Sequence, residues 1–110
     1  MPTYQAVLDA VKPKLNPGET VVEAVAGAIA GEALHTIVAL TSERIRVIAP
    51  SGVTAVEFTN LAGVTWAPTW ARLNIDLKIP RKRIVLAVFG SEWKGRAKDL
   101  ADAVKRRVGK

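Results

Sequence analysis

Residues 72–89 read RLNIDLKIPRKRIVLAVF, and this stretch decides the fold class. Over residues 72–79 every second side chain is Leu or Ile and the others are polar, which is typical of a strand with one buried and one exposed face. Pro80 favours a turn because its φ is fixed and it has no N–H to donate to a sheet. The more apolar run at residues 83–89 predicts a second, more deeply buried strand. The stretch therefore predicts an antiparallel hairpin.

The segments on either side of the hairpin complete an α+β pattern. From residue 20 onward, short apolar runs recur about every ten residues between polar or glycine corners, which predicts about seven strands over residues 20–89. Gly27 and Gly31, inside the first run, predict a bend or the end of a hairpin. Residues 3–12 and 91–108 have helical spacing of apolar residues, the second with a continuous apolar stripe that includes Trp93.

We expect these elements to form one domain over residues 1–110, mainly β with α. Seven twisted antiparallel strands curl into a bent barrel or an orthogonal sandwich, and this leaves an apolar opening at one end. A long helix with a single apolar stripe is suited to cap that opening, with Trp93 as its largest anchor.

Composition excludes several classes of function. The 110 residues include no cysteine, so there is no disulfide, thiolate nucleophile or zinc knuckle, which fits a cytoplasmic location. His35 is the only histidine and has no nearby cysteine, second histidine or carboxylate cluster, so we expect a structural or surface role for it. Nucleotide-binding glycine loops and paired carboxylates are absent. We expect no enzymatic activity, no cofactor, no small-molecule substrate and no membrane-spanning helix.

The net charge of +6 is unevenly distributed. Residues 1–60 carry four Lys/Arg and six Asp/Glu, whereas residues 61–110 carry twelve and four. A basic half is a hint of an anionic partner, although a solvated basic face has the same composition.

Three segments resemble the bacterial pleckstrin-homology-like (PH-like) domains. LTSERIRVIAP (residues 40–50) is similar to the corner between their second and third strands. NPGETVVEAVAG (16–27) looks like their glutamate followed by the first strand, and RKRIVLAVFGSEWKGRAKDLADAVKRRV (81–108) like their last strand and capping helix. The resemblance covers about residues 15–108, and it implies a module for protein interaction and oligomerisation.

Inositide binding does not follow from this resemblance. Members of the wider superfamily that bind phosphoinositides carry a basic motif between the first two strands. Here that region has Glu32 and His35 but no lysine or arginine, and an acidic side chain there repels an inositol phosphate.

Two candidate sites remain, and each goes with one hypothesis of function. The first hypothesis is a protein partner or self-assembly, with Trp66, Pro68 and Trp70 as the interface, because a proline favours an edge strand and tryptophans are common interface anchors. The competing interpretation is that the tryptophans pack beneath the last helix.

The second hypothesis is an electropositive module that docks on nucleic acid or an anionic membrane surface. Its candidate anion-binding residues are Arg81, Lys82, Arg83, Lys94, Lys98 and Lys105. Arg44 and Arg46 alternate with apolar residues, so we predict that both lie on the solvent side of their strand.

Overall fold

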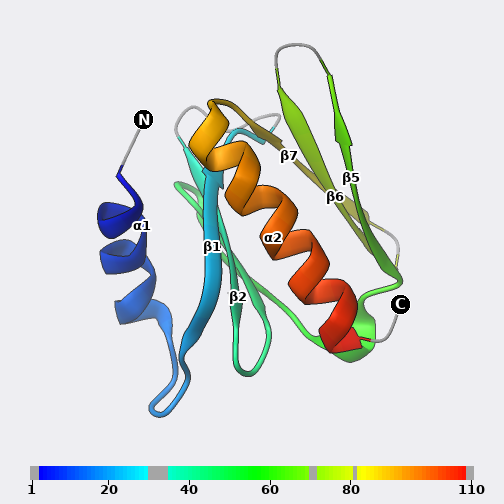
Figure 1. The fold of residues 1–110 in the computed structure, drawn as a ribbon. Helices are drawn as coiled ribbons and strands as arrows, with labels where there is room; N and C mark the ends of the chain where they lie inside the picture. The colour runs from blue at the N-terminus through cyan, green and yellow to red at the C-terminus, as the bar shows by residue number, and fades with distance from the viewer. Residues whose placement is uncertain (1–2, 30–34, 70–71, 81, 109–110) are drawn as a thin grey trace.

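The computed structural model describes residues 3–29, 35–69, 72–80 and 82–108 (Figure 1). In this part of the chain seven antiparallel strands form two sheets, and the predicted α+β class is confirmed. Sheet A has the order β1 (Val21–Gly27), β2 (Thr36–Thr41), β3 (Ile45–Ala49) and β4 (Gly52–Val56); sheet B has the order β5 (Gly63–Pro68), β6 (Leu73–Ile79) and β7 (Lys82–Val88). The helices are α1 (Tyr4–Val11) and α2 (Ser91–Val108), with short 3₁₀ turns at Lys12–Lys14 and Phe58–Asn60.

The two sheets join where the end of β1 approaches β7. Ala28 and Ala87 form an antiparallel bridge, with N–H to O distances of 2.9 and 2.8 Å in the two directions. Gly27 lies against the same strand so closely that a Cβ atom there would be 2.5 Å from the backbone oxygen of Ala87. Gly27 is the last residue of β1, which agrees with the predicted end of a hairpin strand, and the two backbones approach so closely there that only glycine fits. Gly31 lies outside the described residues.

The core lies between the inner faces of the sheets and α2. The alternation in β6 holds, because Leu73, Ile75 and Leu77 are at most 1% exposed. The apolar stripe of α2 is also buried, as predicted, and comprises Trp93, Ala97, Leu100 and Val104. The buried apolar residues of the described part of the chain form one continuous cluster, which extends through sheet A to Val7 and Val11 of α1.

The helices α1 and α2 flank β1 (Figure 1), and a polar cluster ties the three together. The hydroxyl of Tyr4 donates to Oε1 of Glu23 on β1 at 2.9 Å. The guanidinium of Arg96 on α2 stacks 3.4 Å from the centre of the Tyr4 ring and lies 3.7 Å from the same Glu23 oxygen. This places the start of α2 relative to β1 and α1. Neither helix described here is long and apolar enough to cross a membrane.

Candidate interaction surfaces

The tryptophan site predicted from the sequence is only partly described. Trp66 pairs with Ile75 across the sheet and points to the inner side, where the amine of Lys98 on α2 lies 5.1 Å from its ring centre. It is half-buried against the core, which favours the packing interpretation for this side chain. Pro68 is exposed at the end of the edge strand β5, as its chemistry predicts. Trp70 lies outside the described residues.

The basic hairpin does not present a single face. Strand alternation places Lys82 on the inner side of β7 and Arg83 on the outer side, where Arg83 forms an ion pair with Asp76 on β6. That pair lowers the pKa of Asp76, mainly through the hydrogen bond from Arg83. Arg81 lies outside the described residues.

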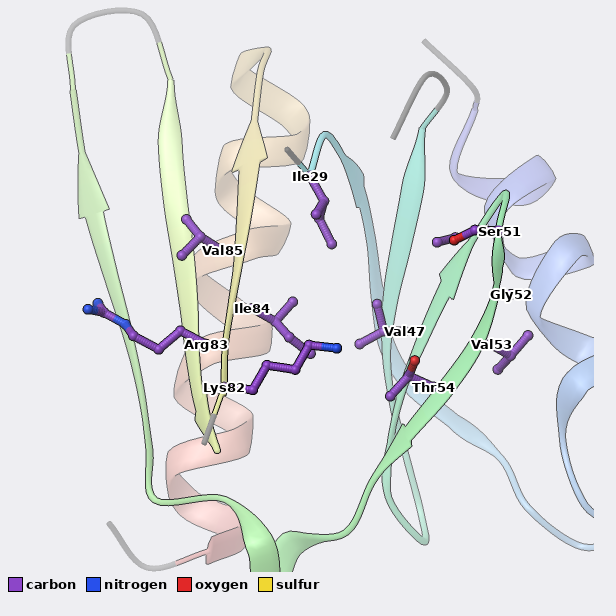
Figure 2. A pocket seen from close by; sticks show the side chains of 11 residues that line it. Ile29, Val47, Ser51, Gly52, Val53, Thr54, Lys82, Arg83, Ile84 and Val85 are labelled. Atoms are coloured by element: carbon purple, nitrogen blue, oxygen red, sulfur yellow. The ribbon is translucent and has the colours of Figure 1, made fainter. Parts of the chain in front are cut away.

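Lys82 borders a cleft of about 690 Å³ between the sheets. Val47 and Ile84 form its nearly buried floor, and Ile29, Thr54 and Lys82 stand around it (Figure 2). Among the residues that the structure describes, no cluster of histidine and carboxylates is placed to hold a metal ion. Arg83 also belongs to the lining, but its side chain points away from the cleft (Figure 2) and pairs with Asp76. The described residues of the cleft thus offer apolar surface and the amine of Lys82.

The three predicted anion-binding lysines of α2 each come directly after a residue of its buried apolar stripe. Lys94 and Lys105 are half-buried, and Lys98 is exposed beside Trp66. Part of their positive charge therefore lies along the edge where α2 meets sheet B. Their role in binding an anion stays a prediction.

The prediction of a solvent-facing Arg46 is wrong. Arg46 is 7% exposed and forms a two-point ion pair with Glu19, Nη2 to Oε1 at 2.6 Å and Nε to Oε2 at 3.1 Å. Alternation does place Arg46 opposite the core, but α1 and the segment after it cover that outer face of sheet A. Arg44 is half-exposed and pairs with Glu57 at 3.2 Å.

Glu19 is held by four donors. Besides the two nitrogens of Arg46, its carboxylate accepts the hydroxyl of Thr41 and, at 2.9 Å, the N–H of Asn16. The hydrogen bond from Arg46 is the largest cause that lowers the pKa of Glu19 to about 2, and it outweighs the effect of burial, which raises the pKa. The pair fixes the segment before β1 onto β2 and β3.

Acid should therefore destabilise the protein through Glu19. Its pKa is lower in the folded chain than in the unfolded one, so the unfolded chain binds more protons at acidic pH. The stabilisation is complete above about pH 5 and is lost as the pH falls toward about 2. We expect it to reach about 3 kcal/mol. Urea unfolding at a series of pH values measures it.

The variant Glu19→Gln provides the reference for this titration. Its free energy of unfolding should change less between pH 5 and pH 2 than that of the wild type, because the group that titrates is gone. Parallel curves for the two proteins would contradict the assignment to Glu19.

Sequence reasoning missed the free edge of sheet A. In the described part of the chain β4 pairs only with β3, so half of its backbone N–H and C=O groups face away from the sheet. Gly52, Val53, Thr54 and Ala55 are all exposed. The signal was present in GVTAV, an apolar strand without any charged residue.

His35 is exposed, consistent with the surface role expected for it. No protein family, curated protein or solved structure matches the chain in comparisons of its sequence and fold. The geometry of the surfaces described above is therefore the basis for a function.

Proposed function

We propose that the chain is a PH-like domain whose function is protein–protein interaction, and that the partner is a second copy of the same chain. The observation that carries the proposal is the edge strand β4, which is exposed over four consecutive residues and uncharged from Gly52 to Val56. Natural proteins usually protect such edges with charged residues or proline, because an open edge can pair with another strand. The absence of this protection favours pairing as the function of β4.

The surroundings of β4 fit an added strand. A groove of about 290 Å³ lies beside the edge and is lined by Thr54, Ala55, Val56, Asn60, Ile79 and Pro80. On the outer face, Ile37, Ile48 and Val53 are directly opposite one another across three strands. Val53 is 44% exposed at the end of this row. A strand that pairs with β4 would extend the row and bury its last member.

The β4 strand of a second copy can be the strand that pairs with β4 and covers Val53. Antiparallel pairing about a two-fold axis at Thr54 places Val53 opposite the partner's Ala55, so each apolar side chain meets another. β4 is uncharged, so the paired strands themselves carry no like charges, although Lys82 lines the cleft beside β4 and each chain carries a net charge of +6. Charged residues elsewhere on the surface would oppose other contacts between copies.

Replacing Val53 by lysine tests the proposal. Wild-type chain should associate reversibly with rising concentration in sedimentation-velocity experiments. Val53→Lys should raise the dimer dissociation constant by about tenfold or more, because it places two like charges near the paired strands. The strand stays solvated in the monomer, so the free energy of unfolding should change little.

Thr65→Lys is the matched control, since Thr65 has the shape of valine and is exposed on β5, and it lines neither the cleft nor the groove beside β4. It makes the same change of charge and should leave the dissociation constant unchanged. A chain that stays monomeric at millimolar concentration, or two variants with equal effects, would overturn self-assembly through β4.

A further inference from the structure

A second groove lies on another part of the molecule, between β1, β2 and the last turns of α2. It has a volume of about 470 Å³ and is lined by Val22, Leu40, Thr41, Ser42, Ala103, Arg106 and Arg107. None of the residues of β4 lines it. Among the residues that the structure describes, the lining combines apolar side chains with two guanidinium groups and includes no carboxylate.

A β-bulge creates the apolar wall of this groove. The register between β1 and β2 shifts between Val21 and Glu23, which leaves Val22 without a partner residue on β2. Val22 is 56% exposed, more than any other large apolar side chain in the described part of the chain. Bulges redirect a side chain and are common next to functional sites. Here the bulge turns a valine into the groove instead of into the core.

Arg107 is held in place at the other side of the groove. Its guanidinium carbon lies 5.0 Å from the centre of the Phe58 ring, and its Nη2 donates to the backbone oxygen of Ser42 at 3.2 Å. An arginine oriented by stacking and by one hydrogen bond keeps other donors for an anion and loses little side-chain entropy on binding.

Arg106 is exposed and, among the residues described, forms no ion pair. Asp102, one turn earlier on α2, does not reach it within ion-pair distance. On the strand wall, the hydroxyl of Thr41 donates to Glu19, whereas the Ser42 hydroxyl accepts the N–H of Thr20 at 3.0 Å and keeps its own hydrogen to donate. The two arginines, together with the Ser42 hydroxyl, are thus the donors of this groove that remain for a ligand.

We propose that this groove binds the C-terminal residue of a peptide, with its carboxylate on Arg106 and Arg107 and its apolar side chain against Val22, Leu40 and Ala103. The proposal follows from the small size of the site, which offers one position for an anion and, directly beside it, one position for an apolar side chain. Neighbouring side chains of an extended peptide point in opposite directions, so an internal acidic residue and the apolar residue next to it cannot both enter. In a terminal residue the carboxylate and the side chain share one Cα atom and enter together.

The charges of the groove agree with this ligand. Arginine binds carboxylates with two parallel hydrogen bonds, and the apolar wall excludes water from one side of the pair. A nucleic acid would need a longer row of cations and exposed aromatic rings for its bases, and this groove provides neither.

A fluorescein-labelled peptide GSGSGL with a free C-terminus is the probe, and fluorescence anisotropy is the measurement. The same peptide with an amidated C-terminus should bind at least about tenfold more weakly, because the charge that pairs with arginine is absent. A peptide that ends in serine instead of leucine should also bind more weakly, because it leaves the apolar wall uncovered.

Two variants of the chain locate the site. Arg106→Glu and Val22→Ser should each weaken binding by about tenfold, and because both residues are exposed, the fold should be kept. Arg72→Glu is the matched control: Arg72 is exposed, lies before β6 and does not line the groove, so the same charge change there should leave binding unaltered. All measurements are repeated in the Val53→Lys chain, so that loss of self-assembly and loss of peptide binding are distinguished.

Three results would overturn the proposal. These are equal binding of the free and amidated peptides, equal effects of Arg106→Glu and Arg72→Glu, or tighter binding of sodium octanoate than of the leucine peptide. The last result would assign the groove to a free carboxylic acid. Amide chemical shifts that move at Val22, Ala103 and Arg106 when the peptide is added would support the proposal directly.

Discussion

Glu19→Gln should lower the free energy of unfolding by about 3–5 kcal/mol at neutral pH. The side chain of Glu19 is fully buried and that of Arg46 is 9% exposed, so the substitution leaves a buried guanidinium without a counter-charge. The amide keeps the volume of the carboxylate, and the loss therefore reports charge and hydrogen bonding rather than a cavity. Urea unfolding followed by tryptophan fluorescence measures the difference.

Two further variants test whether the loss of stability comes from the unpaired charge of Arg46. Glu43→Gln removes a carboxylate whose pair with Arg44 is partly exposed, and it should cost less than about 1 kcal/mol. The double variant Glu19→Leu, Arg46→Met should recover most of the stability lost in Glu19→Gln, since two apolar side chains can replace a buried ion pair. If the double variant were less stable than Glu19→Gln, the buried charge of Arg46 would not be the cause of the loss.

Gly27→Ala should cost about 2–3 kcal/mol, although alanine is only one methyl group larger. The added Cβ would lie 2.5 Å from the oxygen of Ala87 and 2.9 Å from Cγ of Leu86. The side chain of Leu86 can adjust, but the backbone oxygen cannot move without disturbing the bridge between Ala28 and Ala87. The junction of the two sheets should therefore open, and thermal unfolding will show a lower midpoint.

Gly63→Ala is the matched control for this prediction. Gly63 lies in β5, and a Cβ atom there would meet no other atom within 4 Å. Alanine at this position should be neutral or slightly stabilising, because it restricts the unfolded chain. Equal losses in the two variants would show that the cost comes from strand glycines in general and not from the junction.

The sequence was most informative where one local pattern repeats. The alternation in residues 72–79 predicted the buried face of β6, and the stripe of residues 91–108 predicted which side of α2 packs on the core. Both predictions are confirmed because strand and helix periodicity depend on near neighbours alone. The same reasoning failed for Arg46, since alternation reports which side of a strand a residue occupies and not what covers that side.

The candidate surfaces were harder to predict, because they join distant parts of the chain. The candidate Trp66 was found from its residue type, but its position beside Lys98 depends on how α2 crosses sheet B. The groove between Val22 and Arg106 combines a bulge near the start of the chain with the last turns of its final helix. The two adjacent valines at residues 21 and 22 break the strict alternation, and this was the local sign of the bulge.

By itself, the sequence determined the α+β class, the order of the elements and the apolar face of the strongest ones, because these follow from the spacing of apolar residues along a few turns or strands. Only the tertiary structure decided that Arg46 is buried, that Gly27 is at the junction of the sheets and that β4 has a free edge. The physical reason is that burial, ion pairing and strand pairing depend on which surfaces meet. Glu19 and Arg46 are 27 residues apart, and no local pattern specifies that they touch.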